Sequence, residues 1–142
     1  MRPEKRLLIV DDDDAIRALL LTVLRRRGFR LDSARNGVEA IERLRSCRYA
    51  LVVLDLMMPI VNGYDVLEWL DTQPVTERPL VLVLTAGLEP KRFDTKIVVG
   101  LLQKPFDVDL LVDTISGCVL VTDAVCQPDG CPDPANEPRS AS

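Results

Sequence analysis

The sequence predicts an α/β fold built around an open parallel sheet, and three observations support this prediction. Strand-like and helix-like segments alternate along the 142 residues, an order typical of right-handed βαβ crossovers. Some strand-like runs, such as residues 50–54 and 80–84, are continuously aliphatic, as expected where helices cover both faces of a sheet. Several runs end on a carboxylate, a hydroxyl or an ammonium, and open parallel sheets bind ligands beyond the carboxyl ends of their strands.

The first strand and the first helix have clear signals. Residues 6–10 form an apolar run of strand length. Either Asp13 or Asp14 is expected to cap the helix that follows, because aspartate is favoured at helix starts. Gly28 is expected to lie just beyond its C-terminal end. The apolar residues that repeat at helical spacing are Ile16, Leu19, Leu20, Val23 and Leu24.

A second strand is predicted over residues 29–34 from their alternating pattern. Asn36 and Gly37 indicate a turn before the second helix. A third helix is predicted over residues 63–71. The residues that supply these two helical stripes are Val38, Ile41 and Leu44, followed by Val66, Leu67 and Leu70.

The C-terminal half of the pattern contains one ambiguous segment. Residues 100–103 are predicted as the last strand and residues 108–121 as the last helix. Residues 89–99 are predicted as a further helix, with Pro90 in its first turn. The β-branched residues 97–99 are also compatible with an extended segment.

Length and composition indicate one domain. We expect residues 1–121 to form it, and residues 122–142, rich in proline and aspartate, to be disordered because little apolar surface remains to offset the entropy of ordering. No apolar stretch approaches the roughly 20 residues that a membrane span needs, and the first residues lack a signal-peptide core. We therefore expect a cytoplasmic protein that does not insert into membranes.

Charge and histidine content exclude several classes of function. The formal net charge is -4, whereas a nucleic-acid surface needs clustered lysine and arginine, so no nucleic-acid partner is expected. The chain has no histidine, which excludes Ser-His-Asp triads, histidine-ligated metals and histidine general bases. The chemistry is therefore left to carboxylates and one or two lysines.

Polar residues at the strand ends supply the candidate site. Asp11 and Asp12 follow the first strand, Asp55 follows the third, Thr85 the fourth and Lys104 the last. An open parallel sheet would gather these residues at one edge, as three carboxylates, a hydroxyl and an ammonium. Taken singly, each has a plainer interpretation, because aspartate is common in turns and at helix starts and lysine is common on surfaces.

Four motifs in this order resemble the receiver domain of two-component response regulators over roughly residues 5–121. They are Ile9-Val10-Asp11-Asp12-Asp13, then Leu54-Asp55-Leu56-Met57-Met58-Pro59 with Gly63, then Leu84-Thr85-Ala86, then Lys104-Pro105-Phe106. The resemblance implies a single doubly wound, flavodoxin-like sheet of five parallel strands in the order 2-1-3-4-5, flanked by five helices.

The resemblance also implies roles. Asp55 is the expected phosphoacceptor, with Lys104 and Thr85 contacting the phosphoryl oxygens. The expected donor is a histidine kinase or histidine phosphotransfer protein, and the expected output is altered binding to a downstream protein by a monomer or weak homodimer. The expected ligands of Mg2+, which neutralises charge during phosphoryl transfer, are Asp11, Asp12, Asp55 and the backbone carbonyl of Met57.

One departure from the family pattern leaves an alternative function open. Leu101 stands three residues before Lys104, where the family carries an aromatic side chain that turns inward on phosphorylation. The alternative is an interaction module of receiver fold that acts independently of phosphorylation. Two other classes fit less well, because the aspartates at 11–14 would repel the phosphate of a flavin, and a phosphatase would need a cap domain of which the sequence shows no sign.

Overall fold

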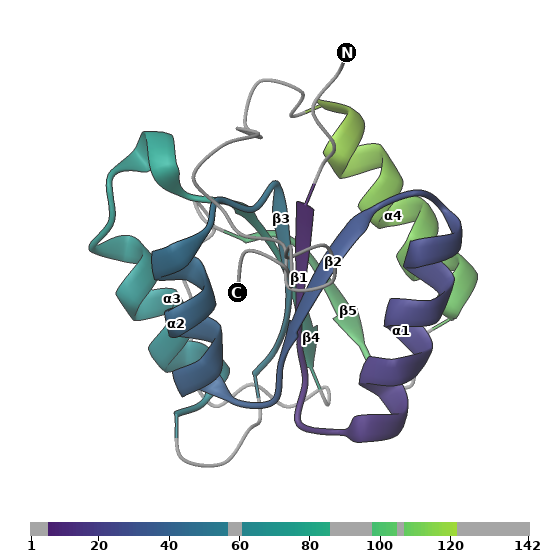
Figure 1. Ribbon diagram of the computed structural model, residues 1–142, viewed down its shortest axis with the longest axis horizontal. Coiled ribbons are helices and arrows are strands. Elements are labelled where there is room, and N and C mark those ends of the chain that lie inside the picture. The colour runs from purple at the N-terminus through teal and green to yellow at the C-terminus, as the bar shows by residue number, and fades with distance from the viewer. Residues whose placement is uncertain (1–5, 57–60, 86–97, 105–106, 122–142) are drawn as a thin grey trace, which may run out of the picture.

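The computed structural model describes residues 6–56, 61–85, 98–104 and 107–121. These residues form a five-stranded parallel sheet covered by helices on both faces (Figure 1). The strand order is β2-β1-β3-β4-β5, so the predicted fold is confirmed. In chain order the elements are β1 (Arg6–Val10), α1 (Asp14–Arg26), β2 (Arg30–Ala34), α2 (Gly37–Ser46), β3 (Leu51–Asp55), α3 (Gly63–Asp71), a 3-10 turn (Val75–Glu77), β4 (Leu80–Thr85), β5 (Val98–Gln103) and α4 (Val108–Val121).

Alternate residues of the central strands face opposite helix layers. In β1, Leu8 and Val10 pack in the core under α2 and α3, whereas Leu7 and Ile9 pack in the core under α1 and α4 (Figure 1). Every residue of β1 and β3 is buried, and apart from Arg6 and Asp55 at their ends both strands are continuous apolar runs. None of the helices in the described ranges combines the length and apolar character needed to cross a bilayer.

Side-chain caps determine where three of the helices begin. Asp13 caps α1 by accepting hydrogen bonds from two amides of its first turn, which confirms one of the two predicted caps. Asn36 caps α2, and Asn62 caps α3 in a capping box with Asp65. All three helix starts follow the carboxyl ends of strands, so they lie at the edge of the sheet that carries the candidate site.

The predicted helix over residues 89–99 falls mainly on residues outside the described ranges. Its last two residues, Val98 and Val99, belong to β5, which therefore begins two residues before its predicted start. A register shift against β4 makes Val99 an extra residue in the ladder. Their β-branched side chains suit an extended backbone better than a helix, so the helical interpretation was wrong for these two residues. The tail at 122–142 also lies outside the described residues.

A buried polar cluster connects β1, β2 and the turn before β3. Arg6 Nη1 donates to Asp32 Oδ2 at 3.4 Å, and the Tyr49 hydroxyl donates to the same oxygen at 2.5 Å. Less than one tenth of each of the three residues is exposed. Burial, together with the hydrogen bond to Asp32 and its negative charge, raises the pKa of Tyr49 far above its ordinary value.

Candidate functional site

Strand geometry places the candidate residues at one edge of the sheet. Val10 and Leu54 are register partners in β1 and β3, so the residues that follow them, Asp11 and Asp55, are level with each other. The strands β2 and β3 follow each other along the chain but lie on opposite sides of β1, so the strand order reverses between β1 and β3 (Figure 1). Open α/β sheets bind ligands at such a reversal.

Asp11, Asp12 and Asp55 form a cluster of three carboxylates. One ligand oxygen of each lies within 4.8 Å of the others. Asp11 is fully buried and Asp55 is 3% exposed, whereas Asp12 is exposed. Oxygen ligands at about 2.1 Å from Mg2+ are about 3 to 4 Å apart, so carboxylates at this spacing suit a small, hard cation. The donor set therefore fits Mg2+, with the exposed side left for water and phosphate oxygens.

Lys104 contacts both buried carboxylates. Its Nζ donates to Asp11 Oδ2 at 3.2 Å and to Asp55 Oδ2 at 3.3 Å. Its backbone amide donates to the Thr85 carbonyl at 2.7 Å, which holds the base of the side chain in place. Burial lowers the pKa of Lys104, but the charges of Asp55 and Asp11 and the hydrogen bonds to them outweigh burial, so the pKa is raised. The lysine is therefore positively charged at neutral pH.

Thr85 lies at the same edge of the sheet as the carboxylates. It is the last residue of β4 and is 2% exposed. Leu84 is the register partner of Asp55, so Thr85 lies one residue beyond the level of that aspartate. Met57, predicted as a ligand through its carbonyl, lies outside the described residues.

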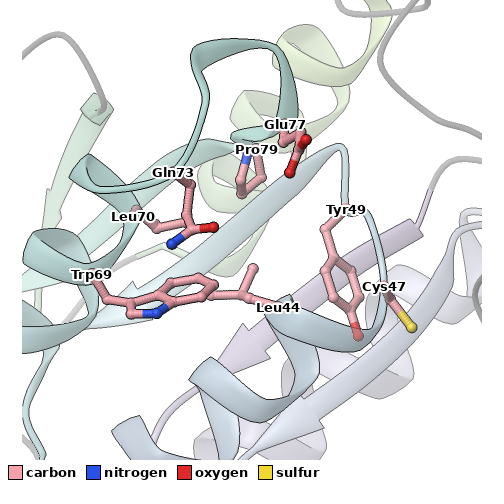
Figure 2. A pocket seen from close by; sticks show the side chains of 8 residues that line it. All are labelled: Leu44, Cys47, Tyr49, Trp69, Leu70, Gln73, Glu77 and Pro79. Atoms are coloured by element: carbon pink, nitrogen blue, oxygen red, sulfur yellow. The ribbon is translucent and has the colours of Figure 1, made fainter.

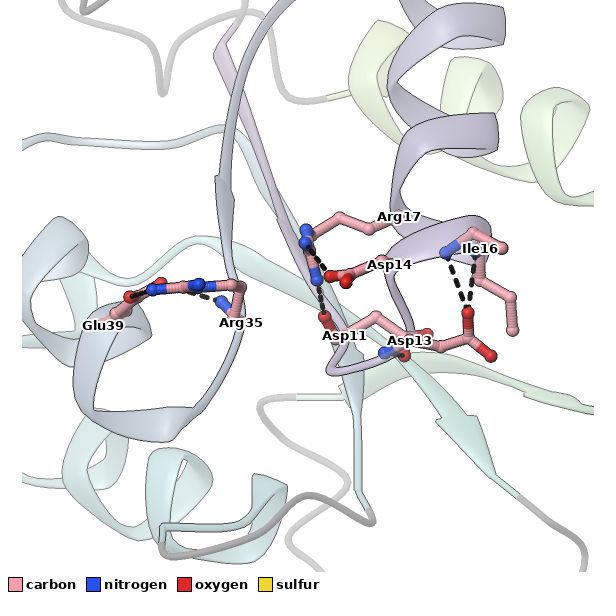
Figure 3. A network of polar contacts seen from close by, with 8 residues as sticks. Asp11, Asp13, Asp14, Ile16, Arg17, Arg35 and Glu39 are labelled. Atoms are coloured by element: carbon pink, nitrogen blue, oxygen red, sulfur yellow. Dashed lines mark hydrogen bonds and ion pairs between the residues drawn. The ribbon is translucent and has the colours of Figure 1, made fainter.

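Arg17 is a neighbour of the site that the sequence analysis did not single out. Its guanidinium donates to the backbone carbonyl oxygen of Asp11 at 2.7 Å and pairs with Asp14 (Figure 3). Asp11 Oδ1 in turn accepts a hydrogen bond from the amide of Asp13 at 2.9 Å. These contacts hold the turn that carries the Asp11 carboxylate. The spacing of Asp14 and Arg17 is a signal for an ion pair on a helix, but it does not reveal the contact with Asp11.

Leu101 lies in β5, the strand at one edge of the sheet, and its side chain is exposed. It is 43% exposed, and Val99 on the same face of β5 is 45% exposed. The position three residues before Lys104 therefore carries an exposed aliphatic side chain.

A pocket at the other end of the sheet contains none of the predicted site residues. It lies between the C-terminal ends of α2 and α3, where Leu44, Tyr49, Trp69 and Leu70 line much of its wall (Figure 2). These residues precede β3 or end the helices, so the pocket lies away from the carboxyl ends of the strands. Its wall combines apolar side chains with Gln73 and Glu77, and it offers a single carboxylate where the strand ends offer three.

Comparison with known sequences identifies the family. The sequence profile of the response regulator receiver domain matches residues 7–116. The transcriptional regulatory protein CpxR homolog of Haemophilus influenzae is 37% identical over 109 residues, which cover 72% of this chain and 44% of that protein. Protein Rrf1 of Nitratidesulfovibrio vulgaris is 36% identical over 138 residues, which cover 92% of this chain and 97% of that protein. The chain thus spans less than half of one relative and nearly all of the other.

Solved structures share the fold. A CheY-like receiver domain protein of Methanospirillum hungatei superposes with a TM-score of 0.77 at 21% identity, covering 85% of this chain and 98% of that chain. The response regulator TrrA of Thermotoga maritima, solved in complex with Mg2+ and BeF, superposes with a TM-score of 0.69 at 32% identity, covering 80% and 98%. The profile match over residues 7–116 and the 36% identity to Rrf1 show that the chain belongs to the response regulator receiver domain family of two-component systems.

Proposed function

We propose that Asp55 accepts a phosphoryl group from a histidine kinase or histidine phosphotransfer protein in a Mg2+-dependent reaction. The observation that supports this most strongly is the shared ammonium of Lys104, 3.2 and 3.3 Å from two buried carboxylates. A third carboxylate, Asp12, completes a cluster within 4.8 Å. Phosphoryl transfer depends mainly on positioning and on neutralising charge on the phosphoryl oxygens, and this edge of the sheet offers groups for both.

Asp55 is the proposed nucleophile. One carboxylate oxygen attacks phosphorus, the bond from phosphorus to the donor's imidazole nitrogen breaks, and its electron pair stays on that nitrogen. The product is an acyl phosphate on Asp55. Bound Mg2+ would neutralise negative charge on the phosphoryl oxygens, and the groups that would hold it are Asp11, Asp12, Asp55 and the carbonyl of Met57.

Lys104 changes partners in this proposal. Before transfer its ammonium is shared by Asp11 and Asp55. Phosphorylation removes the negative charge of the Asp55 carboxylate and adds phosphoryl oxygens, so the ammonium turns toward one of these while staying near Asp11. The Thr85 hydroxyl donates to another phosphoryl oxygen. Both residues thereby make contacts that depend on phosphorylation, as a change in protein conformation or binding requires.

The proposed output is altered binding to a downstream protein. The net charge of -4 disfavours direct contact with nucleic acid. We propose that the chain acts in the cytoplasm, as a monomer or weak homodimer.

Labelling with acetyl phosphate tests the acceptor. We expect intact-mass measurements to show one added phosphoryl group on the wild type with Mg2+, and none on the wild type in chelator or on Asp55→Asn. A phosphoryl increment that survives in Asp55→Asn would remove Asp55 as acceptor. A pull-down that compares phosphorylated wild type with Asp55→Asn then tests the output, because an interaction module independent of phosphorylation would capture the same partner with both.

A further inference from the structure

Two glycines contact the segment that follows the proposed acceptor. A Cβ added at Gly63 would lie 2.6 Å from the carbonyl oxygen of Asp55, and the Gly63 amide donates to the Leu56 carbonyl at 3.0 Å. A Cβ added at Gly37 would lie 2.3 Å from the carbonyl oxygen of Val61, and the Gly37 amide donates to that same oxygen at 2.9 Å. Gly63 therefore lies against Asp55 and Leu56, and Gly37 lies against Val61, two residues before Gly63.

The close approach, not the backbone conformation, accounts for glycine at position 37. The sequence indicated a turn at Asn36 and Gly37, but the structure places Gly37 as the first residue of α2, with Asn36 as its cap. Among the described glycines only Gly28 has a positive φ, so alanine would meet the backbone requirement at Gly37. Alanine is also the better residue for a helix. The feature that disfavours it is Val61, which occupies the space of a side chain.

Both sides of this contact belong to firmly capped helix starts. At α2, Asn36 accepts a hydrogen bond from the Glu39 amide at 2.9 Å. The Glu39 carboxylate accepts one from the amide of Arg35 at 2.9 Å, which Figure 3 shows. At α3, the capping box of Asn62 and Asp65 begins directly after Val61. Because both helix starts are capped, a side chain at position 37 would displace Val61 and, with it, the start of α3 at Gly63, which lies against Asp55.

We propose that Gly37 is a positioning residue for phosphoryl transfer on Asp55. Its missing side chain lets α2 approach Val61, and this approach sets the position of Val61 and of Gly63, which lies against the acceptor. The inference rests on the proposed function. Relieving a contact of 2.3 Å needs a displacement of about 1 Å, and a misplacement of that size near reacting groups can slow a reaction on the order of 100-fold. We expect Gly37→Ala to be labelled by acetyl phosphate at least about tenfold more slowly than the wild type.

Two matched variants separate positioning from general effects of alanine. Gly28→Ala introduces strain at a φ of +91°, where the new Cβ meets nothing within 4 Å, and so destabilises the fold at the opposite end of β2. Gly117→Ala adds a Cβ in open space within α4. Labelling rates are measured with saturating Mg2+ at a temperature where melting curves show each variant folded. We expect both controls to be labelled at the wild-type rate.

A second measurement uses the wild type alone, in case Gly37→Ala does not fold. In a Mg2+ titration followed by NMR, the amide of Gly37 should shift, because its hydrogen-bond acceptor lies in the segment that follows Asp55, while the amide of Gly117 should not. A Gly37 amide unmoved by saturating Mg2+, or a Gly37→Ala variant labelled as fast as Gly28→Ala, would overturn the inference. Absence of labelling in the wild type would instead refute the proposed function.

Discussion

Replacing Lys104 with methionine removes the positive charge and keeps a side chain of similar length. Without Mg2+, the buried carboxylates of Asp11 and Asp55 then lose an ammonium at 3.2 and 3.3 Å. At an effective dielectric constant of about 20, each attraction amounts to about 5 kcal/mol before desolvation. Removing one partner of a fully buried ion pair lowers stability by about 3 to 5 kcal/mol.

The expected loss for Lys104→Met is smaller than for a fully buried pair. The lysine side chain is 24% exposed, so water screens part of the attraction, and burial of the ammonium offsets another part. We therefore expect the free energy of unfolding in chelator to fall by about 2 to 3 kcal/mol. The whole contribution of Lys104 is present at neutral pH. A lysine whose pKa is raised by folding stabilises the fold at any pH below the pKa that it has in the unfolded chain, and the stabilisation is lost only as the pH rises through its pKa in the folded protein.

Urea unfolding followed by the fluorescence of Trp69, the single tryptophan, measures this loss. The matched control is Arg48→Met, which removes an ion pair to Glu77 at 3.9 Å in which about half of each side chain is exposed. Such surface pairs contribute less than about 1 kcal/mol. If Lys104→Met lost no more stability than Arg48→Met, the ammonium would not be neutralising the buried carboxylates and the reasoning would fail.

A double-mutant cycle locates the origin of the loss. In the Asp55→Asn background one of the two carboxylates is already neutral, so adding Lys104→Met should lower stability by less than it does in the wild type. Equal losses in the two backgrounds would mean that Lys104 does not interact with Asp55 in solution.

Two further changes test other parts of the fold. Asp12→Ala in chelator should raise the melting temperature by a few degrees at most, because it removes one of three mutually repelling carboxylates within 4.8 Å, and a lower melting temperature in calorimetry would contradict that crowding. Tyr49→Phe should lower the unfolding free energy at neutral pH by about 1.5 to 3 kcal/mol, because buried Asp32 loses a hydrogen bond. In the wild type, the raised pKa of Tyr49 stabilises the fold below the pKa that the tyrosine has in the unfolded chain, and this stabilisation is lost as the pH rises above about 10. Tyr49→Phe should therefore show a smaller decline in unfolding free energy above that pH. Urea titrations across this range in which the variant declines as steeply as the wild type would contradict this prediction.

Local signals predicted the elements well where they agreed with one another. The helix predicted over residues 63–71 is α3, Gly63–Asp71, whose apolar spacing and capping box point to the same start. The signals conflicted before β5, where Pro90 favoured a helix and the β-branched residues favoured a strand. Val98 and Val99 joined the strand, because pairing with β4 and burial of Val98 are tertiary effects that a local pattern does not contain.

The sequence by itself determined the parallel α/β class and the residues available for chemistry, since the central buried strands read as apolar runs and the candidate polar residues stand where these runs end. Only the tertiary structure decided which of these groups meet. Lys104 reaches Asp11 across 93 residues of sequence, Arg17 holds the Asp11 carbonyl, and Val61 occupies the space beside Gly37. These contacts depend on strand register and on how closely the capped helices approach the sheet, and both are set by packing of the whole core rather than by the periodicity of any one segment.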